Sequence, residues 1–259
     1  MATNLLFVFE GRSSEELITN SLFKYLLTEN QIVKCVFDAE IYQLYRKIDG
    51  DEYLDIFNFI KNKNENNKSL LKNYDRDDFA EIYMFFDYDA HSTLADDETL
   101  KDMLEFFNDE TSNGKLYISY PMVEAIRHIV DFDTFKELTV KCKRNNCMHK
   151  EKCEDKIECL ASPHYKNVVS SESIPQLSNI NGYTRDTWKD LIAVHLSKMN
   201  YIVNDEYKFP SKLESQLKIF INQLQKYVNK QCPSVAILSA FPIFVIDYYG
   251  VTRTRGLIY

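Results

Sequence analysis

Short apolar segments alternate with amphipathic segments through the first half of the chain. The apolar segments cover residues 5–9, 32–37, 82–86 and 116–119, and each is apolar on both faces, as strands buried between two layers are. Between them, helical spacing of apolar residues predicts helices after Ser13 or Ser14, within 40–63, at 94–107 and at 122–130. Residues 62–72 are polar and predict an exposed loop. The alternation predicts an α/β fold with a mainly parallel sheet covered by helices on both faces.

The pattern changes after about residue 133. A polar stretch with four cysteines occupies 141–159, and 163–181 predicts a loop. Helical spacing returns at 187 and at 213–228, whereas 236–249 is apolar throughout and fits a buried helix or a strand equally well. We therefore expect three parts: an α/β domain at 1–132, a Cys-rich segment at 133–181 and a helical C-terminal region at 182–259.

Composition narrows the class of protein. Of the 259 residues, 45% are hydrophobic and 27% are charged, which is typical of a globular protein. No apolar run approaches the roughly 18 residues of a membrane span, and the apolar segment at 4–9 is too short for a signal peptide. We therefore expect a cytoplasmic protein with no membrane partner. Its net charge of −8 argues against a surface that wraps duplex nucleic acid, so contact with nucleic acid would be local.

Carboxylates follow two of the expected strands directly. Glu10 ends the first strand, and Asp87 and Asp89 end the third, where they alternate on one side of an extended segment. Ligands of open parallel sheets bind at the carboxyl ends of the strands, and several carboxylates gathered there favour a hard divalent cation. The pattern predicts a site for Mg²⁺, or for Mn²⁺ in its place. Alternatively, Glu10 only flanks a helix and the two aspartates are turn residues.

The segments "FVFEGRSSEEL" and "FFDYDAH" resemble the signature of the Toprim family, over roughly the first half of the chain. The family includes topoisomerases, primases, repair proteins and nucleases of the overcoming-lysogenization-defect type, and compact relatives act in bacterial antiphage defence beside an ATPase. The resemblance implies that Asp87 and Asp89 bind Mg²⁺ and that Glu10 is a ligand or a general acid or base. Neither a primase zinc ribbon nor the domains of a topoisomerase accompany these segments.

Further candidates for catalysis and substrate binding lie near these motifs. The segment "YISYPMVEAIRHI" resembles one in defence-associated Toprim proteins and makes Glu124 a catalytic candidate; the alternative is a surface helix acid. Arg12 is a candidate for binding substrate phosphate, and the alternative is a solvated side chain. His91 and His128 are candidate proton shuttles or structural residues.

The Cys-rich segment has its own candidate metal site. Cys142, Cys147, Cys153 and Cys159 supply the four thiolates of a structural Zn²⁺ site, with His149 and His164 as alternative ligands. The close Cys-x-x-Cys pair of many zinc sites is absent, and the alternative is a set of unligated thiols. The surrounding lysines and arginines make the segment locally basic and could contact nucleic acid.

The leading functional expectation is a Mg²⁺-dependent nuclease of antiphage defence that cuts DNA or RNA, tRNA included, under the control of a partner ATPase. The second is a non-catalytic Toprim-like interaction subunit, and a third is nucleotidyl transfer. At the C-terminus, Arg253 and Arg255 are additional candidates for contact with phosphate.

Overall fold

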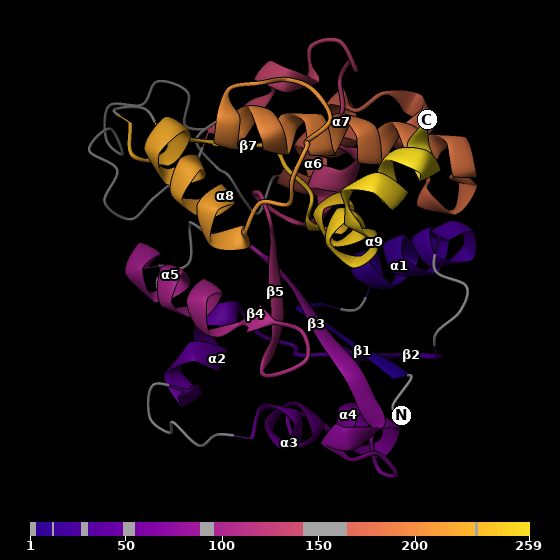
Figure 1. Cartoon of the computed structure of the whole chain (residues 1–259), viewed down its shortest axis with the longest axis vertical. Helices are drawn as coiled ribbons and strands as arrows, with labels where there is room; N and C mark the ends of the chain where they lie inside the picture. The colour runs from indigo at the N-terminus through magenta and orange to yellow at the C-terminus, as the bar shows by residue number, and fades with distance from the viewer. Residues whose placement is uncertain are drawn as a thin grey trace. The chain divides into compact units, whose positions relative to one another are not determined.

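A computed structural model describes residues 4–11, 13–26, 31–48, 55–88, 96–141, 165–230 and 233–259 (Figure 1). The chain divides into two compact units. The first unit comprises Met1–Asp87 and Asp96–Tyr117, and the second comprises Tyr88–Ala95 and Ile118–Tyr259. The boundaries expected near residues 133 and 182 stay predictions.

A mostly parallel five-stranded sheet forms the centre of the α/β part, as the alternation of apolar segments predicts. Its strands stand in the order β2 (Gln31–Val36), β1 (Asn4–Phe9), β3 (Phe79–Asp87), β5 (Gly114–Ser119) and β4 (Asn108–Asp109). Strand β1 pairs in parallel with β2 and with β3, whereas β4 forms a short antiparallel hairpin with β5. Central β1 is buried from Leu5 to Phe9, which explains its uninterrupted apolar sequence.

Helices of the first unit cover both faces of this sheet. They are α1 (Ser13–Leu26), α2 (Ile41–Ile48), α3 (Ile56–Lys61), α4 (Glu65–Leu70) and α5 (Asp97–Phe106). On one face, the ring of Phe7 stacks on Phe85 and contacts Phe23 of α1. Phe86 points to the opposite face, because successive strand side chains alternate, and there it contacts Phe37, which in turn contacts Phe59 of α3.

The segment 62–72 is mostly exposed, as expected, but the expectation of a loop was wrong, because helix α4 occupies 65–70. The Asn64 side chain caps this helix by accepting from the Asn67 N–H at 2.9 Å. Asn67 is itself buried, and its side chain bonds the backbone of Val36 and of Ile60. The asparagines that suggested a loop therefore dock this short helix on strand β2.

The expected helix at 122–130 was also wrong. Tyr120 continues in an extended conformation and exchanges backbone hydrogen bonds with Leu238, at 2.8 and 3.0 Å. After the cis Tyr120–Pro121 peptide, only a short 3-10 helix forms, η2 (Val123–Arg127). Since the pairing partner lies more than 100 residues away in sequence, no local pattern could reveal it.

The second unit is mainly helical. Its principal elements are β6 (Thr139–Lys141), α6 (Tyr165–Glu172), α7 (Arg185–Asn204), α8 (Gln216–Gln223), the π-helical turn η6 (Leu224–Val228), β7 (Ser234–Ala236) and α9 (Ala240–Ile258). The helices expected from 187 and at 213–228 are confirmed as α7 and as α8 with η6. The loop expected at 163–181 was wrong where α6 lies. The apolar stretch at 236–249 ends one strand and begins a helix that is kinked at Gly250.

Short 3-10 helices complete the described elements. They are η1 (Arg76–Asp78), η3 (Phe135–Glu137), η4 (Pro175–Leu177) and η5 (Ile180–Gly182). Across the ranges described above, none of the helices is both long enough and apolar enough to cross a membrane.

Candidate metal centre

Glu10 and Asp87 meet at the carboxyl edge of the parallel sheet. Phe9 lies opposite Phe85 in the β1–β3 register, and the Glu10 N–H donates to the Phe85 carbonyl at 3.1 Å. The next hydrogen bond between the two strands has a side-chain acceptor in place of a backbone carbonyl. The Asp87 N–H donates to Oε2 of Glu10 at 3.0 Å. The structure therefore places Glu10 and Asp87, two of the three residues that the sequence assigns to the site, side by side at this edge, with the Glu10 carboxylate bonded to the Asp87 backbone. Asp87 is buried and Glu10 is half-buried.

A further carboxylate, Glu15, shapes the turn between β1 and α1. It lies in the first turn of α1, is buried, and its Oε1 accepts from the Gly11 N–H at 3.1 Å. This bond fixes the backbone directly after Glu10, so Glu15 is a positioning residue for the sheet edge. From the sequence, Glu15 lies in the first turn of the helix expected after Ser13 or Ser14 and is not a site candidate. Its position four residues after Gly11, in the first turn of a helix, where a carboxylate can reach back to a backbone N–H, was the available signal.

Several predicted site residues lie outside the described residues. They are Arg12, Asp89, His91, Cys142, Cys147, Cys153, Cys159, His149 and His164. Within the part of the chain that the structure does describe, no group of three or more His, Cys, Asp or Glu side chains could hold a metal ion. The described core of the candidate metal centre is thus the Glu10–Asp87 pair.

The pair fits a hard divalent cation. Both side chains carry oxygen donors, which Mg²⁺ prefers, and the cation commonly takes one or two protein carboxylates together with water and substrate phosphate. One oxygen of Glu10 bonds the Asp87 N–H, which orients this carboxylate at the edge. Asp89 follows Asp87 by two residues and is the predicted third ligand.

Glu124 belongs to the second unit and lies in η2. It is buried, and its Oε1 lies 3.2 Å from Nζ of Lys166 in α6. Nearby, buried His128 contacts the Tyr165 hydroxyl through Nδ1 at 3.0 Å and the Glu172 carboxylate through Nε2 at 3.2 Å. Burial lowers the pKa of His128, and the bond to Glu172 partly opposes this. These contacts join η2 to α6, and the predicted catalytic roles of Glu124 and His128 stay predictions.

Two buried basic residues of α7 were missed by the sequence reasoning. Lys198 donates from Nζ to the carbonyls of Phe135 and Leu138, at 2.8 and 2.5 Å, and burial holds its pKa well below the usual range. His195 is fully buried beside it. Both share the helix face of Leu191 and Ile202, all of them buried, so their position on an apolar stripe was the available signal.

Comparison of the chain with protein-family models, with curated proteins and with solved structures finds no match in any of the three.

Proposed function

We propose that this chain is a Mg²⁺-dependent nuclease of the Toprim type that hydrolyses phosphodiester bonds in DNA or RNA. The observation that carries the proposal is the junction of Glu10 and Asp87, in which acidic residues at the ends of adjacent parallel strands are linked by the 3.0 Å hydrogen bond. This edge is where open α/β sheets bind their ligands. Glu10 and Asp87, which belong to the motifs that resemble Toprim sequences, lie at this edge.

The chemistry follows from the donor set. When bound, a Mg²⁺ ion would supply Lewis-acid activation of phosphate and water. Asp87 and Asp89 would hold this ion, and Glu10 would serve as a further ligand or take the proton of the attacking water. The bond from the Asp87 N–H keeps the Glu10 carboxylate oriented before substrate arrives. Arg12 would neutralise charge on the substrate phosphate.

The proposal extends to a place in antiphage defence and to control by a partner ATPase, on the strength of the sequence resemblance alone. The rival function is a non-catalytic interaction subunit. It is favoured by one feature of the same junction, since Glu10 accepts a backbone N–H as a purely structural residue would. A test of the metal centre separates the two.

The test is cleavage of labelled single-stranded DNA, duplex DNA and RNA with Mg²⁺, Mn²⁺ or EDTA. We expect metal-dependent cleavage that falls by about 100-fold or more in Asp87→Asn, because the amide removes a charged ligand but keeps the shape of the side chain. Asp77→Asn is the matched control, since Asp77 is exposed in η1 of the same unit. The nuclease proposal fails if none of the substrates is cut with either metal, or if Asp87→Asn cuts as well as the unaltered chain.

A further inference from the structure

Charge is divided unequally between the two units. The first unit contains 12 Lys and Arg against 23 Asp and Glu, whereas the second contains 19 Lys and Arg against 16 Asp and Glu. The net charge of −8 therefore arises in the first unit, which holds Glu10 and Asp87. A polyanion that reaches this chain would be repelled by most of the first unit and attracted by the second.

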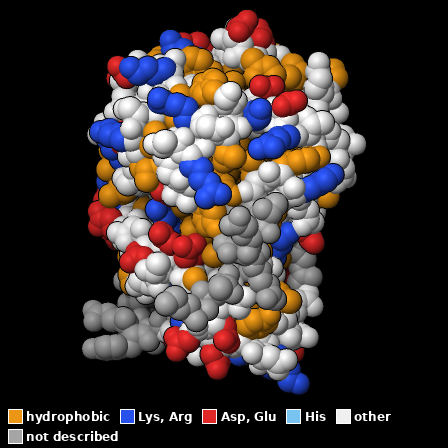
Figure 2. Space-filling view, turned by 45° about the vertical axis from the view of Figure 1, so that its right-hand side comes forward, with side chains coloured by type: hydrophobic (Ala, Val, Ile, Leu, Met, Phe, Trp, Pro, Cys, Tyr) orange, Lys and Arg blue, Asp and Glu red, His pale blue; other side chains and the backbone are white. Residues whose placement is uncertain are grey.

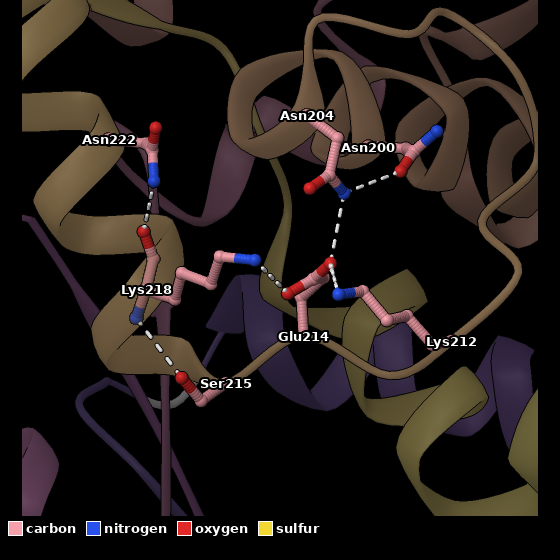
Figure 3. Close-up of polar contacts among 7 residues, drawn as sticks. All are labelled: Asn200, Asn204, Lys212, Glu214, Ser215, Lys218 and Asn222. Atoms are coloured by element: carbon pink, nitrogen blue, oxygen red, sulfur yellow. Dashed lines mark hydrogen bonds and ion pairs between the residues drawn. The ribbon is translucent and has the colours of Figure 1, made fainter.

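A cluster of basic side chains surrounds the buried carboxylate of Glu214, between α7 and α8 (Figure 3). Lys218 Nζ lies 2.8 Å from Glu214 Oε2, and Lys212 Nζ lies 3.7 Å from Oε1. Asn204 donates to Oε1 at 2.9 Å. One negative charge thus positions two lysines whose side chains are 66% and 42% exposed, which leaves a positive surplus at the surface.

Aromatic rings and an arginine gather at Phe209, in the connecting segment that also carries Lys212 and Glu214. The guanidinium of Arg255, in the last turns of α9, lies 5.1 Å from the ring centre of Phe209, three residues before Lys212. Tyr259 packs its ring edge-on against Phe209, with centroids 6.1 Å apart, yet is 80% exposed. Asn200 holds the connecting segment by donating to the Glu206 and Lys208 carbonyls.

The arrangement joins exposed cations to an exposed aromatic ring on an ordered framework. In Figure 2, Lys and Arg side chains are interspersed with apolar and acidic ones over the upper part of the face. Lysine and arginine bind phosphates, and an exposed ring offers a platform for an unpaired base. A duplex keeps its bases stacked, so the ring favours a single strand.

We propose that Lys212, Lys218, Arg255 and Tyr259 form a binding surface for single-stranded nucleic acid. This inference rests on the proposed function, because the surface would capture the substrate of the nuclease. In this proposal Arg255 binds phosphate, as its place near the C-terminus suggested from the sequence. The aromatic contact with Phe209 holds its guanidinium at the surface.

The test is fluorescence anisotropy of a labelled 20-nucleotide oligo(dT) with the full chain in EDTA, where a metal-dependent enzyme cannot cut. The triple variant Lys212→Gln, Lys218→Gln, Arg255→Gln is expected to weaken binding about tenfold. The slope of log affinity against log salt should flatten by about two, which corresponds to three phosphate contacts on a single strand. Tyr259→Ala should weaken binding about tenfold without altering that slope.

The matched control is Arg185→Gln with Lys189→Gln, which removes two basic residues from the other end of α7 and should leave affinity unchanged. The proposal is overturned if the triple variant binds oligo(dT) as well as the unaltered chain, or if duplex DNA binds equally well and Tyr259→Ala has no effect. It is overturned too if the triple substitution changes only self-association, seen by sedimentation. Binding without cleavage in Mg²⁺ would instead reject only the nuclease proposal.

Discussion

At the scale of single residues, the interior of the second unit holds an unusual pair of basic side chains. His195 Nδ1 accepts from the Ser239 N–H at 3.2 Å, so Nε2 carries the proton and faces the Ile126 carbonyl at 3.4 Å. Burial, together with the nearby charge of Lys198, lowers the pKa of His195 to about 3, even though the bond to the Ile126 carbonyl partly opposes both effects. The neutral imidazole therefore joins α7 to the segments before α9 and within η2.

We expect the folded state to lose stability in acid, because His195 is buried and neutral. Its pKa is lower in the folded state than the usual 6.5, so the unfolded chain takes up the proton first, and stability is lost as pH falls from about 6.5 towards 3. Between pH 7 and pH 5 the loss from His195 is about 2 kcal/mol. His195→Gln, whose amide can make both hydrogen bonds, should lose about 2 kcal/mol less over this range, as measured by urea unfolding. Identical pH dependence of the two proteins would contradict this assignment.

The candidate metal centre was also partly predictable residue by residue. The position of Glu10 and Asp87 at one edge was predictable because each ends a strand with an uninterrupted apolar sequence, and the ends of parallel strands lie at one edge, whereas their role as metal ligands stays a prediction. The role of Glu15 was not found, because its bond to the Gly11 N–H depends on the geometry of the turn. His195 and Lys198 were missed because a charged residue type suggests solvent exposure.

At the scale of elements, helix α4 shows how polar side chains can dock a segment. Asn67 accepts from the Val36 N–H at 3.2 Å and donates to the Val36 and Ile60 carbonyls at 2.9 and 3.1 Å. These bonds join α4 to strand β2 and to α3, so one side chain links three elements. Composition alone suggested a loop, since it does not show which amides become buried.

Replacement of this amide should therefore destabilise the first unit. Asn67→Ala removes three hydrogen bonds and leaves the Val36 N–H without its side-chain acceptor, and we expect it to cost about 2 kcal/mol. The carbonyls of Val36 and Ile60 keep the donors of Asn64 and Lys63. Asn66→Ala is the matched control, because its side chain is exposed on the same helix and should change stability by less than about 0.5 kcal/mol. Urea unfolding measures both. Equal stability of the two variants would show that the Asn67 contacts contribute little.

Elements that depend on local pattern were predicted well, and those that depend on distant pairing were not. The four long strands of the sheet and helices α1, α5 and α7 follow from apolar spacing. In contrast, the chain after β5 pairs with Leu238 at Tyr120 and forms no full helix. The stretch at 236–249 stayed ambiguous because Ala240–Ile246 is buried on every side, so it has no polar stripe to reveal its period.

At the scale of the whole molecule, the two units differ in charge as well as in structure. The acidic first unit contains the sheet edge with Glu10 and Asp87, and the second unit contains the basic residues around Glu214. The division is consistent with the proposal that a chain of net charge −8 would bind a polyanion through a local surface and a metal. The total charge indicated that contact with nucleic acid would be local, but it did not indicate where on the chain. The place proposed here depends on the folded surroundings of Lys212, Lys218 and Arg255, which the sequence does not show.

The most direct measurement of the central claim is anomalous diffraction from crystals soaked in Mn²⁺, which stands in for Mg²⁺. The account predicts an anomalous peak at the sheet edge, within about 2.3 Å of carboxylate oxygens of Asp87 and Asp89 and close to Glu10. The peak should vanish in Asp87→Asn crystals soaked in the same way. The account would be contradicted by a well-ordered sheet edge that shows no anomalous peak. It would also be contradicted by a structure in which these carboxylates point apart.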